Sequence, residues 1–318
     1  AYFGKIPTHG DFVRHNAGSA TMRALDEWIQ QGLYFAKTHM SQALNTAYEE
    51  AHTCSFFFAP REAAQVFLGV IRPSRDSVGR TFPFLVGQEM ETSAFDTHHV
   101  SQVSIAYHAF FERAAHLVDK GVEGRVGHHD LTPHVEALGT PVADASSVAF
   151  FGHYLQQTRL TSLWERLWGH AQDSRKYLLF KNLLDILLPL RSGVPAHFPL
   201  VLRFPLCSDG RTLDFDVSFW IGLCLRLLGY PALQPSFFWS QAGPARDKDV
   251  FLLVALRPPS PKTFAYLLPG HPESDTLCNL EQMGGQKAAL AALSIPARYG
   301  RMLEDEQLTL WDFLRHLH

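Results

Sequence analysis

The chain has 318 residues, of which 46% are hydrophobic and 19% charged, enough apolar material for one large domain or two. Its formal net charge of -3 provides no basic excess to attract nucleic acid or an acidic membrane surface. No stretch approaches about 18 uninterrupted apolar residues, and the segment from Ala1 to Asp11 lacks an apolar signal-peptide core. These features predict no membrane span and no nucleic-acid partner.

The cysteines favour a reducing compartment. No two of the four are spaced as C-x-x-C, so neither a redox motif nor a zinc motif is present. Each lies in or near an apolar stretch, where a buried free thiol is the expected state in a reducing environment. They are Cys54, Cys207, Cys224 and Cys278.

The first part of the chain predicts strands around one amphipathic helix. Residues 2–6 form a short expected strand, followed by a loop punctuated by Pro7, Gly10 and Asp11. Apolar residues at three- and four-residue spacing then predict a helix with Thr21 as its N-cap. That apolar face comprises Leu25, Trp28, Ile29, Leu33 and Ala36.

A wide hairpin is predicted next. The segment 54–58 has the composition of a buried strand, and the apolar runs 66–71 and 82–88 flank a polar loop at 73–80. Helical spacing then recurs over about 98–119.

The second part predicts helices, then strands and helices. The segment 121–147 is rich in Gly, His and Pro and is expected to be a loop, interrupted by a short helix at 131–138. Further helices are expected near 147–157, 160–171, 174–190, 214–228, 261–268 and 308–317, and strands near 200–204, 236–240 and 250–256. Both halves share this order of elements, which suggests a diverged duplication, although no residue-level repeat supports it.

These elements predict an α/β fold with a mixed sheet and helices on both faces. Extra helices are expected in the middle of the chain and at its C-terminus. We expect a single domain, 1–318. Its possible lobes are 1–120 and 195–285, with a helical insertion at 121–194 and a C-terminal extension at 286–318.

Several segments resemble the TagF (ImpM) family of type VI secretion accessory proteins. The opening residues YFGKIPTHGDFV, at 2–13, are similar to the family pattern Y/F-G-K-hydrophobic-P-x-x-G-D-F-V. The hairpin GVIRPSRDSVGRTFPF, at 69–84, is similar to G-V-x-x-P-S-x-D-x-V-G-R-x-F-P-L. The helix with Trp28 and the segment PSFFWS, at 235–240, match two further family segments in order.

The resemblance implies a three-layer α/β/α sandwich and a cytoplasmic regulator without enzymatic activity or cofactor. Family members are regarded as post-translational repressors of type VI secretion. They are associated with the forkhead-associated-domain scaffold and with a kinase and phosphatase pathway. Type VI secretion components are therefore the expected partners.

The family motifs supply the candidate partner-binding residues, and their best candidate site is a polar patch formed by two loops. If the first strand lies beside the hairpin, both loops occupy one end of the sheet. The candidates are Lys5, His9, Gly10, Asp11, Trp28, Ser74, Asp76, Gly79 and Arg80.

The hairpin loop has two interpretations. Asp76, Gly79 and Arg80 could present a guanidinium and backbone N–H groups to a phosphate. In the favoured structural alternative, Asp76 accepts N–H groups of its own loop and Arg80 pairs with Asp11. His9 and Asp11 could likewise form an acid–base or metal site, although a turn made by Gly10 and capped by Asp11 is favoured.

Other chemistry has weaker support in the sequence. The histidines at 128, 129 and 134, with Asp130, resemble metal ligands, but we expect Pro133 to break any helix there and leave a solvated loop. His52 and Cys54 point the same way on a strand, without a third catalytic group. No nucleophile elbow, P-loop or dinucleotide-binding glycine motif occurs.

Three hypotheses about function follow: a binding regulator of type VI secretion, a structural component of the secretion apparatus, and a phosphate-handling hydrolase. The hydrolase would use His9, Asp11, Asp76 and Arg80, which it requires within a few ångströms in one pocket.

Overall fold

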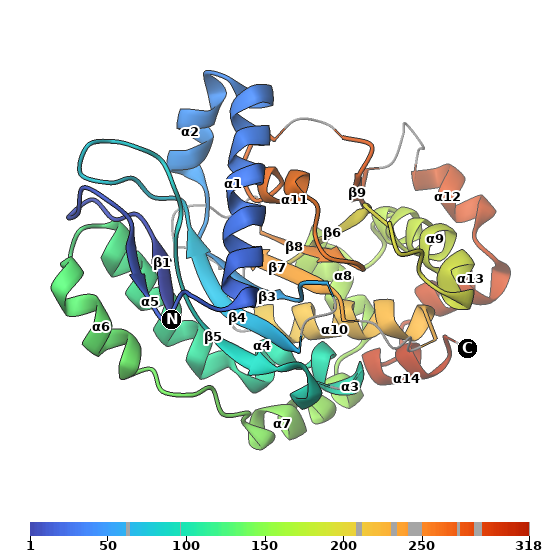
Figure 1. The fold of residues 1–318 in the computed structure, drawn as a ribbon. Coiled ribbons are helices and arrows are strands. Elements are labelled where there is room, and N and C mark those ends of the chain that lie inside the picture. Colours follow the sequence, from blue (N-terminus) through green and yellow to red (C-terminus); the bar gives the residue numbers. More distant parts are fainter. Residues whose placement is uncertain are drawn as a thin grey trace.

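The structure is a computed structural model that describes residues 1–61, 64–95, 97–207, 212–229, 234–240, 250–271, 274–282 and 288–317. These residues build a nine-stranded sheet in the order β2-β1-β5-β4-β3-β7-β8-β6-β9 (Figure 1). The strands are β1 (Tyr2–Gly4), β2 (Val13–His15), β3 (Cys54–Phe58), β4 (Gln65–Arg72), β5 (Phe84–Glu91), β6 (Val201–Pro205), β7 (Ser236–Ser240), β8 (Phe251–Ala255) and β9 (Leu277–Asn279).

The sheet is mixed, as expected, because β6 and β9 pair in parallel while the other neighbouring strands are antiparallel. Its centre is the β3–β7 pair, in which Phe56 lies opposite Phe238 and Phe57 opposite Phe237. The pairing of β3 with β7 joins the first part of the chain to the last part within one sheet.

Both faces of the central strands are buried, which explains their nearly continuous apolar sequences. Phe57, Phe237 and Trp239 point into the larger core, whereas Phe56 and Phe238 point into the smaller one. Successive side chains of a strand alternate between faces, so such residues need a helical layer on each side.

Helices supply these two layers and confirm the three-layer arrangement. The smaller core lies under α1 (Ala20–Met40), α2 (Ala43–Glu50) and α11 (Pro261–Ala265). The larger core contains residues of α4 (Val103–Ala106), α5 (His108–Val122), α6 (His128–Glu136), α7 (Ala145–Gln157), α8 (Leu160–Trp168), α9 (Arg175–Leu187), α10 (Leu213–Leu227), α13 (Ala297–Glu304) and α14 (Leu310–Arg315). The remaining helices are α3 (Thr97–Ser101), α12 (Ala288–Ser294) and the 3-10 turns η1 (Thr92–Ala94) and η2 (Leu188–Ser192).

Several element boundaries differ from the sequence prediction. The N-cap of α1 is Ser19, whose hydroxyl accepts the Met22 N–H at 3.0 Å, and Thr21 lies inside the helix. The predicted helix over 98–119 is divided into α3, α4 and α5. The short elements β2, α2, β9, α12 and α13 were not predicted, because three to eight residues give too few periods of a pattern.

Helix α6 confirms the short helix predicted at 131–138, although it begins at His128, and it corrects the solvated loop predicted at the histidines. Helix α6 runs through Pro133. A proline inside a helix removes one N–H bond and crowds the preceding turn. Burial of Leu131 and Val135 against the larger core holds the helix together despite that cost.

The two halves are not simply related by rotation. Helix α1 follows β1 and β2, and helix α10 follows β6, but the two helices pack into different cores and so lie on opposite faces of the sheet. A two-fold axis normal to the sheet would keep both helices on the same face. The arrangement therefore gives no support to the duplication.

A close approach of two glycines makes room for a large ring in the smaller core. Gly69 of β4 lies opposite Gly87 of β5, and the ring of Phe67 lies over them. A Cβ at Gly87 would overlap that ring and the Leu68 carbonyl oxygen.

We expect Gly87→Ala to destabilise the fold by about 1–3 kcal/mol, the range for overpacking a core. Gly152→Ala in α7 is the control, because no atom lies within 4 Å of its added Cβ. This control should be neutral or stabilise by up to about 1 kcal/mol, as an alanine does in a helix. Urea unfolding measures both changes, and equal stability of the two variants would contradict the packing described for Phe67.

Candidate functional site

The two motif loops lie at the same end of the sheet, as predicted. Strand β1 is antiparallel to β5, so the residues after Gly4 run beside those before Phe84. The Ser77 N–H donates to the His9 carbonyl oxygen at 3.0 Å, and the Arg80 guanidinium donates to the Gly10 carbonyl oxygen. Backbone and side chain together tie the hairpin to the loop after β1.

Asp76 is the centre of this contact. The residue is 3% exposed. Its Oδ2 accepts from Lys5 Nζ at 2.8 Å and from Arg80 Nε at 2.7 Å. Its Oδ1 accepts the N–H groups of Val78 at 3.1 Å and Arg80 at 2.8 Å. We call Lys5, Asp76 and Arg80 the Asp76 cluster.

The cluster keeps Asp76 ionised. Burial by itself would raise the pKa of this carboxyl, because it disfavours the charged form. The bonds from Lys5, Arg80 and the Val78 N–H outweigh burial and hold the pKa of Asp76 well below its usual range. A carboxylate with four donors and a lowered pKa is poorly suited to accept a substrate proton near neutral pH.

The loop geometry decides between the two interpretations of the hairpin. The N–H groups of Val78 and Arg80 bond the Asp76 carboxylate, so the expected N–H bonds to Asp76 are confirmed. The expected Arg80–Asp11 pair is wrong: Arg80 pairs with Asp76, and the exposed Asp11 accepts the Phe12 N–H at 2.8 Å. Buried Asp76 offers Arg80 a stronger, less screened partner than an exposed carboxylate could.

The remaining hairpin candidates are structural. Gly79 has a φ of +86°, a conformation that favours glycine, and its N–H donates to the Asp76 carbonyl oxygen at 3.0 Å. The carbonyl oxygen of Ser74, a buried residue, accepts the Phe82 N–H at 3.1 Å and closes the hairpin.

Trp28 lies elsewhere, in the smaller core. Its ring stacks on Phe238 with centroids 5.1 Å apart, and its Nε1 donates to the Ser260 carbonyl oxygen at 2.9 Å. Gly32, one turn later in α1, lets that helix approach Phe264 of α11 closely. Trp28 therefore anchors α1 to the last part of the chain and is not placed with the two loops.

His9 makes a contact that the sequence analysis did not predict. Its ring centroid lies 4.6 Å from that of His128, the first residue of α6. His129 lies 5.4 Å beyond His128. Across the part of the chain that the structure describes, no group of three or more His, Cys, Asp or Glu side chains could hold a metal ion.

Apolar side chains surround the Asp76 cluster at the surface. Phe12 is 38% exposed and Val78 70% exposed. The Phe12 ring packs against Phe82, with centroids 4.8 Å apart, and Lys5 Nζ lies 5.0 Å from its centroid. We call Phe12, Val78 and the exposed Arg80 side chain the loop surface.

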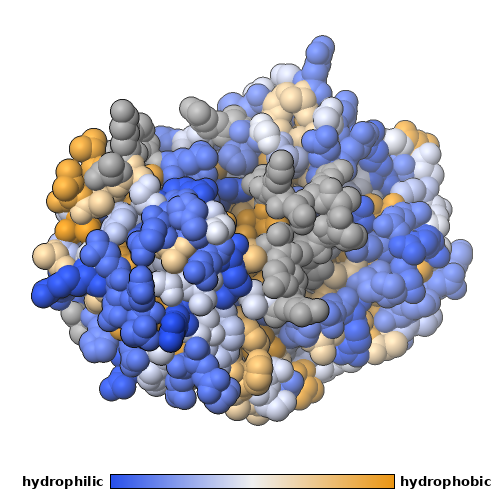
Figure 2. Space-filling view, turned by 180° about the vertical axis from the view of Figure 1, so that it is seen from behind, coloured by the Kyte–Doolittle hydropathy of each residue, from blue (hydrophilic) through white to orange (hydrophobic). Residues whose placement is uncertain are grey.

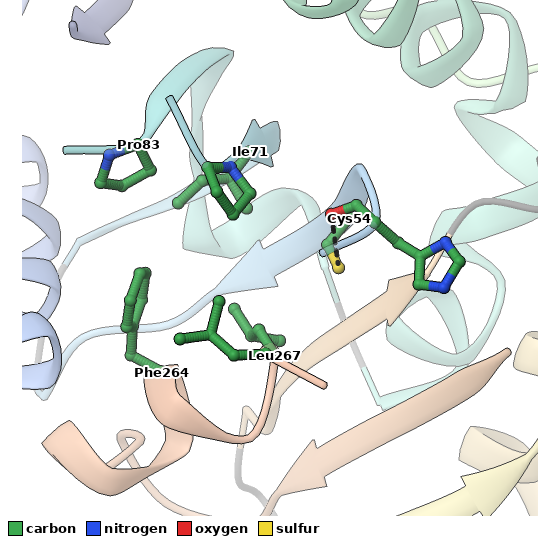
Figure 3. Close-up of a pocket in the computed structure, with 8 residues that line it drawn as sticks. Cys54, Ile71, Pro83, Phe264 and Leu267 are labelled. Atoms are coloured by element: carbon green, nitrogen blue, oxygen red, sulfur yellow. Dashed lines mark hydrogen bonds between the residues drawn. The ribbon is translucent and has the colours of Figure 1, made fainter. Parts of the chain in front are cut away.

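The Cys54–His52 alternative gains no geometric support. Cys54 lies beside a cavity of about 10 Å³, room for about one water molecule. Figure 3 shows its lining, including Ile71, Pro83 and Phe264. The thiol sulfur lies 3.8 Å from the His52 carbonyl oxygen, and burial raises the pKa of Cys54 to about 12. Such a thiol remains protonated and unreactive at neutral pH.

Other exposed apolar areas are separate from the loop surface. A groove of about 480 Å³ on α1 is lined by Tyr34, Phe35, His39 and Pro261, among others. Leu290 and Leu293 of α12 are 57% and 84% exposed. The face in Figure 2 is mainly hydrophilic, with apolar residues gathered in a few distinct areas.

A second polar contact also lies outside the predicted site. His108 Nδ1 lies 2.5 Å from Asp214 Oδ2, and the bond to Asp214 raises the pKa of His108. The Ser104 hydroxyl donates to the Asp214 carbonyl oxygen at 2.9 Å and does not face His108 as a nucleophile would. The sequence could not reveal this pair, because 106 positions separate its members.

Replacing Asp76 should test the cluster. A carboxyl with a depressed pKa contributes stability that is present above its unfolded pKa of about 4 and is lost as pH falls toward the folded value. We expect Asp76→Asn to lower the urea midpoint at pH 7 and to flatten the loss of stability below about pH 4.

Asp11→Asn is the matched control, because Asp11 is exposed, and its effect should stay within about 0.5 kcal/mol. An Asp76→Asn variant as stable as Asp11→Asn at pH 7 would show that the cluster contributes no stability.

The family comparison agrees with the motifs. Residues 1–138 match the TagF N-terminal domain family, described as type VI secretion system-associated. The crystal structure of PA0076 from Pseudomonas aeruginosa PAO1 is similar at 16% identity and a TM-score of 0.49, over 86% of this chain and 95% of that one. No curated protein matches the chain in sequence. The family match spans both motif loops and the whole Asp76 cluster, so residues 1–138 form a TagF N-terminal domain, a type VI secretion-associated domain.

Proposed function

We propose that this protein is a cytoplasmic regulator of type VI secretion that acts by binding another protein and not by catalysis. The family match supports the association with type VI secretion. Repression is the form of regulation that the family resemblance implies. No helix among the described residues is long and apolar enough to cross a bilayer.

The observation that carries the proposal is how the Asp76 cluster uses its charges. Both oxygens of Asp76 are bonded within the protein, and Lys5 is 6% exposed. Ordered loops on a rigid scaffold are a common place for binding residues. The cluster gives the two loops one fixed shape, and the Asp76 carboxylate at its centre is fully bonded within the protein.

The loop surface has the composition of a protein-binding site. Phe12 and Val78 offer apolar area beside the Arg80 guanidinium. Aromatic and arginine side chains are enriched among residues that dominate binding energy. Because bonds fix both loops beforehand, a partner would lose little free energy in ordering them.

The proposed partner is a type VI secretion component, and the family resemblance makes the forkhead-associated-domain scaffold the first candidate. We assign the loop surface to that contact.

Substitutions at the loop surface should weaken partner capture. Val78→Asp and Phe12→Ser each remove exposed apolar area without touching Asp76, and each should weaken binding about 30-fold if the residue contributes about 2 kcal/mol. Tyr34→Asp on α1 is the control, since Tyr34 is 75% exposed and belongs to a separate groove.

The measurement is affinity purification from the host with quantitative mass spectrometry, followed by titration of the purified partner. Capture of secretion components that is equal for all three variants would remove the loop surface from the proposal. Failure of the unmodified chain to capture any secretion component would contradict the function itself.

Secretion by host cells separates a regulator from a component of the apparatus. Deleting the gene should raise type VI secretion if the protein represses it, and Val78→Asp should reproduce the rise. Secretion that stops on deletion would instead establish an assembly component. Turnover of a phosphate ester by the purified chain, abolished by Asp11→Asn, which leaves the Asp76 cluster intact, would support the hydrolase alternative.

A further inference from the structure

The loop that carries His9 and Phe12 is held against α6 by a short seam. The His9 and His128 rings are in contact, with centroids 4.6 Å apart and planes inclined by 32°. The Tyr2 hydroxyl bonds the Thr132 hydroxyl at 3.0 Å, and His15 Nε2 lies 3.5 Å from Glu136 Oε1. Behind the seam, α6 buries Leu131 and Val135 in the larger core.

The contact between the two imidazoles depends on protonation. Neutral rings at this distance attract each other through dispersion and buried area. Two imidazolium rings at the same distance carry like charges and repel each other. A drop in pH therefore changes the sign of the interaction without moving any atom first.

The surroundings of His128 favour its neutral form. Its Nδ1 is buried and has no hydrogen-bond partner among the described residues, so a proton there would be a buried donor without an acceptor. Burial, and then the neighbouring His9 and His129, lower the pKa of His128. At neutral pH the seam is therefore in its attractive state.

The other charged groups around the seam have partners of their own. Arg80 of the hairpin pairs with Asp76, which also holds Lys5 of the loop. At the end of α5, Glu123 pairs with Arg125 and lies 3.5 Å from Arg72. Asp11 of the loop and Asp130 of α6 are exposed, and neither is bonded to the His9 or His128 ring in the described chain. His129 is the third imidazole of the row.

We propose that His9 and His128 form an acid-sensitive latch between the loop surface and α6. With both rings neutral, the latch holds the loop that carries Phe12 against α6. Protonation of the pair releases α6 and loosens that loop. The effect on partner binding rests on the proposed function, whereas the release of α6 does not.

Hydrogen exchange of the unmodified chain tests the latch directly. We compare amides in α6 with amides in the centre of α5, at pH 7.5 and pH 5.5, after correction for intrinsic exchange rates. In the wild type, the exchange of α6 relative to α5 should increase severalfold at the lower pH. In His128→Phe, which keeps a ring but cannot be protonated, this ratio should not change with pH.

Three further variants provide the controls. His9→Phe removes the same repulsion from the other side, so it should also abolish the pH response even if His128→Phe folds poorly. His39→Phe on α1 should behave as wild type, because His39 contacts Phe35 of its own helix. His15→Phe should increase the exchange of α6 at both pH values, since it removes the contact of His15 with Glu136.

An α6 exchange ratio in the wild type that is the same at both pH values would overturn the latch. So would a pH response that persists in both His9→Phe and His128→Phe. Partner titrations then separate the two proposals. If α6 is released at pH 5.5 but affinity for the captured partner is unchanged, the latch stands and the loop surface is not the docking site.

Discussion

The buried Asp76 carboxylate is the constraint on which the motif loops depend. A buried charge is tolerated only when partners compensate for lost water, and removing one partner leaves an uncompensated charge. Lys5 follows β1, and Arg80 lies at the far side of the hairpin. Both segments must therefore come to Asp76 for the fold to form. The same requirement explains why the loops are ordered although they are at the surface.

The pairing of β3 with β7 at the centre of the sheet places a second constraint on the whole chain. The family domain, 1–138, ends in sequence before β7, yet its strand β3 pairs with β7 and its Trp28 stacks on Phe238. Without those later residues, β3 would be an exposed, strongly apolar edge strand, which invites aggregation. The core of the first 138 residues is thus completed by the rest of the chain, and the two motif loops lie at the end of a sheet that both parts build.

The sequence predicts the sheet and the meeting of the two loops, because strand patterns and motif order are local signals. The sequence does not predict which charged side chains of the loops form ion pairs. In the sequence, Asp11 and Asp76 are equally suitable partners for Arg80, because both are aspartates of the motif loops. Only burial in the folded protein distinguishes them. The helix predicted at 131–138 begins three residues earlier, and the loop predicted at the histidines is wrong, since tertiary burial of Leu131 overrides a local helix breaker. The His9–His128 contact joins positions 119 residues apart and leaves no pattern in the sequence.

A site built this way is suited to recognition. Catalysis needs an acid or base whose proton can leave or arrive near the working pH, and such groups usually remain accessible and incompletely bonded. At this end of the sheet, the acid with the most strongly shifted pKa is also the most completely bonded, and its shift favours permanent ionisation. The groups exposed beside it include an aromatic ring, a valine and a guanidinium. These can contribute area and a fixed charge to a partner, and their positions are set by a cluster that no partner has to touch.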